Sequence, residues 1–484
     1  MLDLAAILLA LGLLMYFAFR GVTLILLAPC AALLAALLTG GLPILAAYTQ
    51  VFMNGCGQFF ISFFPLFMLG AIFGKLMDDT GSAKAIAGSV SGWLGPQRAI
   101  ASVVLCCAVL TYGGVSAFVV AFAIYPVAAA LFRDANIPKR LIPGAIALGA
   151  FSFTMSALPG TPAIQNAIPM PFFGTTAFAA PGLGILAGLI MLGFGLMWLE
   201  RRAATARTGG EGYGEHYDSL PKPDVALREH AVNQGFDIAE LAEEPAVSEN
   251  LPPFWLAVLP IVIVIVANFV FIEVVVPLMD TAFLAKPLFG ETTIENVRGV
   301  WSVIVGLFLA ILLQIAANWR RLTDLRSTLD HGTDASVLPI ANTASLVGFG
   351  AVIAALPAFG LISEAVLAIG GGSPLISVAS SVAILSAMTG SASGGMSIAL
   401  DSLGTTLVGL ANTAGVSLEA MHRVTAVASG ALDALPHNGA VITLLGVCKL
   451  SHGESYFDVL MTSVVGPMIA LIVIITVASL VGSF

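Results

Sequence analysis

Three polar side chains lie beside a proline in one of the most apolar parts of the chain. Asp433 precedes Pro436, and His437 and Asn438 follow it, within the apolar stretch 421–450. Burying a carboxylate at membrane depth costs about 2.5–3.5 kcal/mol, and such residues are typical of proton relays and ligand sites. We therefore predict that Asp433 carries a proton, and that His437 binds an anion or joins the same relay.

Structural roles compete with these predictions. Asp433 can cap a half-helix, and His437 can be satisfied by backbone carbonyl groups. Asp401, on the return limb of the second predicted hairpin, is interpreted as a packing or gating residue.

The first half of the chain carries a related pattern. Ser156-Ala157-Leu158-Pro159 resembles Asp433-Ala434-Leu435-Pro436, and the two prolines are 277 positions apart. At the same offset, Gly113 and Ser116 correspond to Gly390 and Ser393, and Ser152 corresponds to Ser429. Small residues coincide easily by chance, so this match gains its weight from the similar order of apolar segments in the two halves.

Both prolines lie inside apolar stretches and predict discontinuous helices. A proline in a helix interior removes a hydrogen bond and costs about 3 kcal/mol. The N-terminus of a half-helix carries unpaired N–H groups and a partial positive charge, which suit a carboxylate. The alternative is a pair of ordinary proline kinks. The residues predicted to bind the ligand are Gly113, Gly114, Ser116, Gly160, Thr161, Asn166, Gly390, Ser391, Ser393, His437 and Asn438.

The composition places these residues in a membrane. Hydrophobic residues make up 58% of the 484 residues and charged residues 10%, and the mean hydropathy is +0.99. A soluble domain carries about 25% charged residues. The long apolar runs predict an all-α polytopic membrane protein. The net charge of −9 excludes a nucleic-acid partner.

We predict five membrane spans and one re-entrant hairpin in each half of the chain, arranged as two inverted repeats. Residues 1–199 form the first repeat, 200–250 a cytoplasmic linker, and 251–484 the second repeat. The hairpins cover about 99–132 and 374–410, and the broken helices about 141–168 and 421–450. The other spans are predicted at Leu2–Phe19, Gly21–Gly40, Phe52–Leu76, Pro181–Leu199, Phe254–Pro277, Gly299–Ala317, Leu338–Ile369 and Phe457–Val481.

The positions of the basic residues predict the orientation of these spans. With residues 200–250 in the cytoplasm, only Lys286, Arg298 and Arg423 of the nineteen Lys and Arg residues lie toward the outside. This asymmetry follows the positive-inside rule and predicts that both termini face outside, in a bacterial-type inner membrane. Arg423 is expected to extend to the membrane surface.

At this point the sequence resembles the gluconate permease family, within a wider superfamily of anion carriers. The resemblance extends over nearly the whole chain and is most specific at residues 433–443 and 448–452. The segment His437-Asn438-Gly439-Ala440 lacks the acidic residue that gluconate carriers have near this break, so it is more similar to 3-hydroxybutyrate permeases. The resemblance implies a homodimer with an elevator-like transport domain.

The sequence and this resemblance together predict a secondary transporter that imports a small hydroxy-monocarboxylate by proton symport. The alternative is a sodium-coupled carrier of di- or tricarboxylates. We expect no cofactor, no metal and no enzymatic activity, because the chain has neither HExxH nor a GxSxG motif with a usable His/Asp pair. The expected partners are the organic anion, a proton or sodium ion, and the lipid bilayer.

Overall fold

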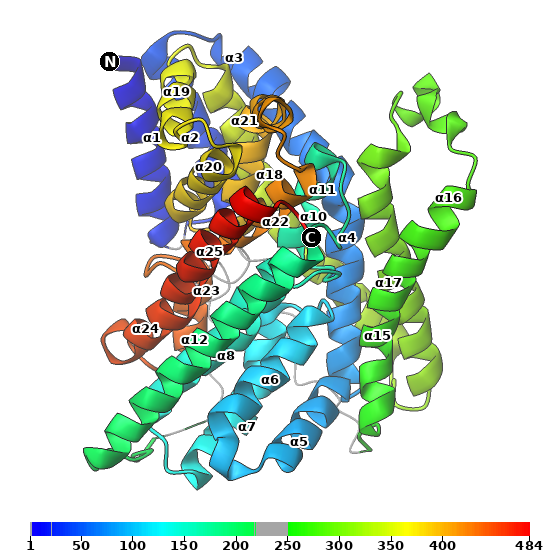
Figure 1. Cartoon of the computed structure of the whole chain (residues 1–484), viewed down its shortest axis with the longest axis vertical. Helices are drawn as coiled ribbons and strands as arrows, with labels where there is room; N and C mark the ends of the chain where they lie inside the picture. Colours follow the sequence, from blue (N-terminus) through cyan, green and yellow to red (C-terminus); the bar gives the residue numbers. More distant parts are fainter. Residues whose placement is uncertain (1, 21, 217, 219–249) are drawn as a thin grey trace.

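The computed structural model describes residues 2–20, 22–216, 218 and 250–484, and within these ranges the chain forms helices and no strands (Figure 1). Among the described helices, six are long and apolar enough to cross a membrane, or seven if one bent pair is a single span. The fold is therefore the predicted all-helical, polytopic one. Most of the predicted linker 200–250 lies outside the described residues.

The first half begins with two short apolar helices and a long one that contains a π-helical turn. A hairpin, a broken helix and a long final helix follow. The elements are α1 (Leu2–Phe19), α2 (Leu24–Thr39), α3 (Ile44–Ala46), η1 (Ala47–Phe52), α4 (Met53–Asp79), α5 (Ser82–Leu94), η2 (Pro96–Arg98), α6 (Ala99–Tyr112), α7 (Ala117–Asp134), η3 (Lys139–Leu141), α8 (Ile142–Ala147), η4 (Leu148–Ser152), α9 (Phe153–Ser156), α10 (Ile164–Ala167), α11 (Pro169–Phe173) and α12 (Pro181–Thr208).

The second half repeats this order. The elements are α15 (Phe254–Val270), η5 (Phe271–Val275), α16 (Val276–Leu278), η6 (Ala282–Ala285), η7 (Pro287–Phe289), α17 (Ile294–Asn318), α18 (Leu325–Ala355), α19 (Phe359–Ile369), α20 (Pro374–Thr389), α21 (Ala392–Ala414), α22 (Leu418–Ala431), α23 (Gly439–Cys448), α24 (His452–Leu460), η8 (Met461–Val465) and α25 (Gly466–Val481).

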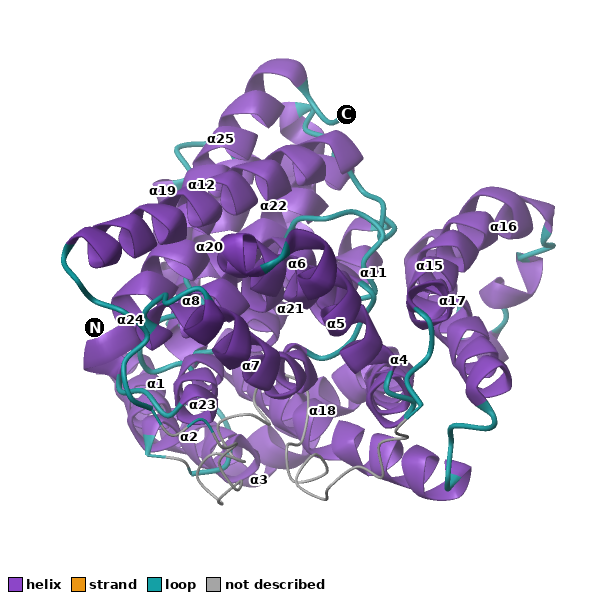
Figure 2. Cartoon of the chain, turned by 90° about the horizontal axis from the view of Figure 1, so that it is seen from below, coloured by secondary structure: helices purple, strands orange, loops and turns teal. Residues whose placement is uncertain are grey.

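Corresponding helices of the two halves pack in corresponding ways. The pair α1 and α2 matches the pair α15 and α17, and these two pairs lie on opposite sides of the molecule (Figure 2). The most extensive helix contact joins α4 to its counterpart α18, while α2 packs on α18 and α17 packs on α4. Such reciprocal packing is what two inverted repeats predict.

Glycines allow the close contact between α4 and α18. A Cβ atom on Gly348 would lie 2.7 Å from the carbonyl oxygen of Phe52, and one on Gly332 would lie 2.8 Å from the Cα of Ile72. Small residues at helix crossings let the backbones of two membrane helices approach closely. Such close packing drives helix association in membranes, because lipid provides no hydrophobic driving force between helices.

Both predicted helix breaks are present, and each hairpin consists of two packed limbs. The first broken helix is interrupted at residues 157–163 and the second at 432–438. Two boundaries were predicted wrongly. The expected span Leu338–Ile369 ends at Ala355, and α19 is a separate helix after Leu356-Pro357-Ala358. The helix α5 was not predicted, and a bend of 101° at Gly95-Pro96 separates it from α6.

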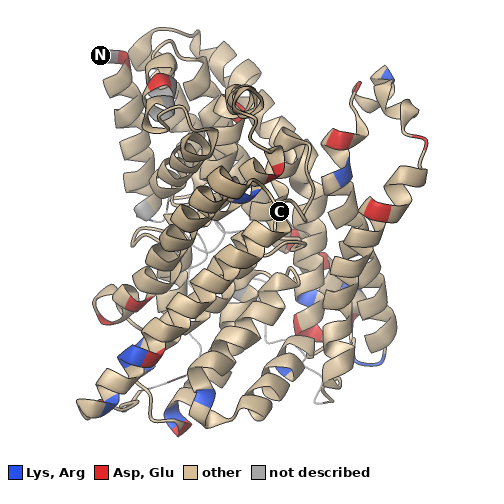
Figure 3. Ribbon diagram, viewed as in Figure 1, with Lys and Arg blue, Asp and Glu red and all other residues tan. Residues whose placement is uncertain are grey.

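Lys and Arg residues gather in the lower half of the molecule as drawn in Figure 3. The N-terminus lies at the opposite end (Figure 1). This distribution is what the positive-inside rule leads us to expect. The orientation itself stays a prediction.

Candidate functional site

Two adjacent cavities lie where the first hairpin tip and both helix breaks meet. The first cavity encloses about 90 Å³, and the residues on its wall include Leu66, Gly70, Gly114, Ser116, Pro162 and Gln165. The second cavity, which we call the junction cavity, encloses about 20 Å³, and the residues on its wall include Ser156, Gln165, Ala392, Asp433 and Asn438. The junction cavity therefore touches both breaks and the second hairpin tip, but has room for little more than one water molecule.

Gln165 connects the two cavities. It lies on α10, directly after the first break, and its side chain lines both cavities together with Met155. Gln165 is 4% exposed, and its Oε1 has no hydrogen-bond partner. The hydroxyl of Thr111, which also lines the first cavity, is likewise buried without a partner. Buried polar atoms are nearly always paired, so two unpaired atoms on one cavity wall indicate a ligand site.

The first hairpin tip packs directly on the first break. Gly114 has a φ of +94°, and a Cβ there would lie 2.7 Å from Cγ of Pro162. Only glycine fits this conformation and this distance. The hydroxyl of Tyr112 donates to the carbonyl of Pro159 at 2.7 Å, and the N–H of Gly160 donates to the carbonyl of Ala177 at 2.8 Å.

A buried arginine forms hydrogen bonds to residues that follow the first break. Arg423 on α22 is fully buried, and its guanidinium donates to the carbonyls of Ala177 and Ala179 and, at 3.1 Å, to Oδ1 of Asn166. The expectation that Arg423 extends to the membrane surface is therefore wrong. Its partners precede it in the chain by more than 240 residues, so local sequence gave no sign of them.

Asn166 is occupied by this framework. Its Nδ2 donates to the carbonyls of Thr161 and Ala177, and its Oδ1 also accepts a hydrogen bond from His422 Nε2 at 3.2 Å. His422 is therefore protonated at Nε2, and its Nδ1 accepts from the hydroxyl of Thr175 at 2.6 Å. Asn166 holds the loop after the break and lines neither cavity.

Asn438 closes the second break. It is fully buried, and its Nδ2 donates to the carbonyl of Gly390 at 2.8 Å and to Oδ1 of Asp433 at 2.7 Å. Its Oδ1 accepts from the N–H of Ala440 at 2.6 Å and caps α23. His437 bonds through Nε2 to the carbonyl of Ala387 at 2.8 Å. The second break is thus tied to its own hairpin by its own polar side chains.

The residues predicted to bind the ligand or to carry the proton are divided by this arrangement. Gly114 and Ser116 line the first cavity, and Asp433 and Asn438 line the junction cavity. The others lie on neither wall: Gly113, Gly160, Thr161, Asn166, Gly390, Ser391, Ser393 and His437. Ser391 instead caps α21 by accepting from the N–H of Gly394. The binding roles of all these residues stay predictions.

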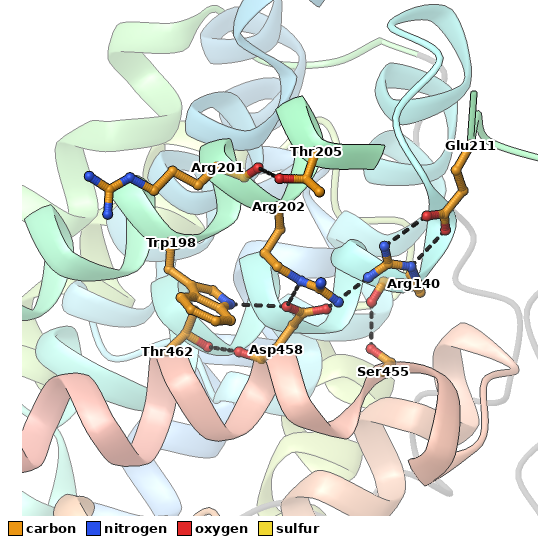
Figure 4. A network of polar contacts seen from close by, with 9 residues as sticks. All are labelled: Arg140, Trp198, Arg201, Arg202, Thr205, Glu211, Ser455, Asp458 and Thr462. Carbon is orange, nitrogen blue, oxygen red and sulfur yellow. Dashed lines mark hydrogen bonds and ion pairs between the residues drawn. The ribbon is translucent and has the colours of Figure 1, made fainter. Parts of the chain in front are cut away.

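At the far end of the broken helices, a charged network joins the two halves (Figure 4). Asp458 on α24 is 1% exposed and accepts hydrogen bonds from Trp198 and Arg202 on α12, both at 3.0 Å. Its other oxygen accepts from Arg140 at 3.3 Å, and Arg140 also makes two hydrogen bonds to Glu211. The network fixes the stem of the first broken helix to the helix that follows the second.

Comparisons with known proteins agree with a membrane carrier. The chain is 42% identical over 486 residues to a Bacillus subtilis (strain 168) protein described as the uncharacterized transporter YxjC, and the match covers 99% of both chains. The fold is similar to the crystal structure of the YdaH transporter of Alcanivorax borkumensis, with a TM-score of 0.57, 14% identity and 88% of each chain covered. No family model matches the chain. The resemblance to gluconate permeases stays a prediction.

Proposed function

The chain belongs to the same transporter family as the Bacillus subtilis protein YxjC, and on that premise we propose that it imports a small hydroxy-monocarboxylate together with a proton. The observation that carries this proposal is Gln165, whose unpaired oxygen lies between two cavities at the meeting point of both breaks. Substrate sites of inverted-repeat transporters lie at such a meeting point.

The first cavity offers complementary groups for the two ends of such a substrate. Its wall includes Ala117, the first residue of α7, and the N–H groups of a first helical turn lack partners within the helix. Together with the Thr111 hydroxyl, these donors suit a carboxylate. On the same wall, Oε1 of Gln165 is an acceptor, which suits the substrate's hydroxyl group.

Cavity size and charge favour this substrate over a larger anion. The first cavity encloses about 90 Å³ and has no Lys or Arg on its wall. A di- or tricarboxylate brings a second or third negative charge, which would need further compensating groups at membrane depth. Arg423, a fully buried cation at the first break, is consistent with one substrate charge.

Elevator-type alternating access is the mechanism we propose for this carrier. The two hairpins, the two broken helices, α12 and α25 form a contiguous group of helices. In the proposed mechanism this group moves as one body against the layer that contains α4 and α18. The charged network of Figure 4 supports such a rigid group, because it joins η3, at the start of the first broken helix, to α12 and α24.

Uptake into proteoliposomes tests the proposal. We expect labelled D-3-hydroxybutyrate to accumulate when an inward proton gradient is imposed, and not when only a sodium gradient is imposed. Unlabelled gluconate and citrate should compete weakly. Accumulation that is driven only by sodium and blocked by citrate would favour the di- or tricarboxylate carrier.

Gln165→Leu tests the site itself. The substitution keeps the volume but removes the acceptor, so we expect the KM for the hydroxy acid to rise about tenfold, the effect of one hydrogen bond of roughly 1.4 kcal/mol. The matched control is Gln97→Leu in η2, where the side chain is exposed. An equal effect of both substitutions, or none from Gln165→Leu, would contradict the assignment of Gln165.

A further inference from the structure

A larger cavity, with polar side chains on part of its wall, lies outside the site described above. It encloses about 480 Å³ between α4, α11, α18 and α21. We call it the polar cavity. The polar side chains on its wall are Asn54, Gln58, Ser62, Ser397, Asp401 and Ser402. Polar side chains at membrane depth are costly and mark ion or substrate pathways.

Asp401 is the one titratable residue on this wall. It is exposed to the cavity, and in the described part of the chain it forms neither a hydrogen bond nor an ion pair. Ser397 lies one helical turn before it, is 1% exposed, and has a hydroxyl without a partner. The hydroxyl of Ser402 is also buried and unpaired. These groups are available to a ligand or to water.

Charged groups on the neighbouring helices do not line the polar cavity. α10, α11 and α20 contain no titratable residue. On α22, His422 and Arg423 are buried in the framework of the first break, and Glu419 lies in the first turn. The remaining charged residues of α18 and α4 lie away from the cavity wall, which includes none of them: Arg326, Asp330, His331, Asp334, Lys75, Asp78 and Asp79.

One face of α4 connects the polar cavity to the first cavity. Asn54, Gln58 and Ser62 line the polar cavity, and Leu66 and Gly70, the next residues at the same four-residue spacing, line the first cavity. Residues four apart lie on the same face of a helix. At 1.5 Å per residue this face extends about 24 Å. This face of α4 carries polar side chains where it lines the polar cavity, and apolar residues beyond Ser62.

We propose that Asp401 is the carboxylate that takes up the coupling proton, from water in the polar cavity. The proposal rests on the proton symport proposed above and assigns its ion site to the return limb of the second hairpin. Asp433, in contrast, is held by Asn438 within the second break.

The change in charge explains the coupling. A hydronium ion gives one proton to an oxygen of Asp401, one O–H bond forms, and a water molecule is left. A charged carboxylate cannot leave the polar part of α4 for its apolar part without a large desolvation penalty, whereas the neutral acid can. The proton returns to water on the other side of the membrane. With one substrate carboxylate per proton, net charge transfer is zero.

The experiment compares two modes of transport in proteoliposomes that contain the full chain. The first is accumulation of labelled D-3-hydroxybutyrate driven by a proton gradient, and the second is exchange of labelled for unlabelled substrate at equal pH. Asp401→Asn resembles the protonated state permanently. We expect it to lose accumulation by at least about tenfold and to retain exchange, because the loaded carrier can still move. Asp330→Asn, at an exposed site on α18, is the matched control and should retain both.

Several outcomes would overturn the assignment. Accumulation by Asp401→Asn at the wild-type level would do so, as would loss of accumulation with retained exchange in Asp433→Asn alone. If the wild type itself shows no proton-driven uptake, the proposed function fails, and Asp401 is tested without substrate. An infrared carboxylic-acid band should appear on acidification in the wild type and be absent in Asp401→Asn, and no difference between the two would refute proton binding at Asp401.

Discussion

The two helix breaks have similar sequences but different surroundings. At the first break, Gln165 leaves an oxygen unpaired beside a cavity of about 90 Å³. At the second, Asn438 uses its amide group to bind Gly390, Asp433 and Ala440. The first break is therefore open to a ligand, whereas the second is closed by its own side chains.

The support of the two breaks differs in the same way. The first break depends on distant residues, because Arg423 and His422 from the second half hold Asn166 and the loop at 175–179. The second break is stabilised locally, by residues within about fifty positions of Asn438. A break held from outside can keep its own polar groups free for a substrate. This difference indicates that the two repeats have divided binding and structural roles.

The largest effect is expected at the two hairpin tips. Gly114→Ala places a Cβ 2.7 Å from Pro162 at a φ of +94°, whereas Gly390→Ala places one 3.4 Å from His437 at a φ of +61°. Both substitutions cost about 1–2 kcal/mol of backbone strain, but only the first adds a clash with a rigid ring. We expect Gly114→Ala to lower the uptake rate about a hundredfold and Gly390→Ala about tenfold or less.

The measurement is the initial rate of uptake of labelled D-3-hydroxybutyrate per amount of reconstituted protein. Size-exclusion chromatography excludes misfolded variants. Equal losses at the two tips would show that the breaks are functionally equivalent, which would contradict the comparison.

A smaller effect, on stability, is expected from the two amide side chains. Asn438→Leu removes a helix cap and the hydrogen bonds that the amide donates to Asp433 and to the Gly390 carbonyl, so the free energy of unfolding should fall by about 2–4 kcal/mol. Gln165→Leu removes an oxygen that has no partner, so stability should be unchanged or higher. Thermal unfolding in detergent compares the two. A strong destabilisation by Gln165→Leu would mean that Gln165 is a structural residue.

The sequence predicts the positions of the breaks because proline acts locally. Pro159 and Pro436 lie in the interrupted segments that they were expected to cause. The sequence also indicates the hairpins, through glycine and serine clusters within apolar runs. The helix α5 and the separation of α19 from α18 were not predicted, because both are short helices, of 13 and 11 residues, whose direction depends on packing and not on composition.

The polar framework could not be predicted in the same way. Arg423 lies among small and apolar residues, and its burial depends on carbonyls at Ala177 and Ala179 that only the tertiary fold brings near. Asn166 was predicted to bind the ligand and its neighbour Gln165 was not, but Asn166 turns to Arg423 and Gln165 turns to the cavities. Successive side chains on a helix point about 100° apart, and this difference in direction determines which of the two amide side chains is structural.

The smallest effect is expected at the charged stem of the first broken helix. Arg140 donates two hydrogen bonds to Glu211, which lower the pKa of that carboxyl below its usual value of 4.5, and the charges of Arg140 and Arg202 act in the same direction. Because the pKa is lower in the folded protein, the stabilisation is present above about pH 4.5 and is lost as the pH falls toward the folded pKa. The Glu211 side chain is 46% exposed, so we expect at most about 1 kcal/mol.

The wild type should therefore lose slightly more stability than Glu211→Gln when unfolding is measured across this pH range. Glu215→Gln, at an exposed site nearby, serves as the control and should behave like the wild type. Asp458 in the same network is 1% exposed and has three partners, two of them arginines. If Glu211→Gln altered stability by several kcal/mol, the network would depend on its surface carboxylate, and the buried Asp458 would not be the group that holds the stem of the first broken helix to α24.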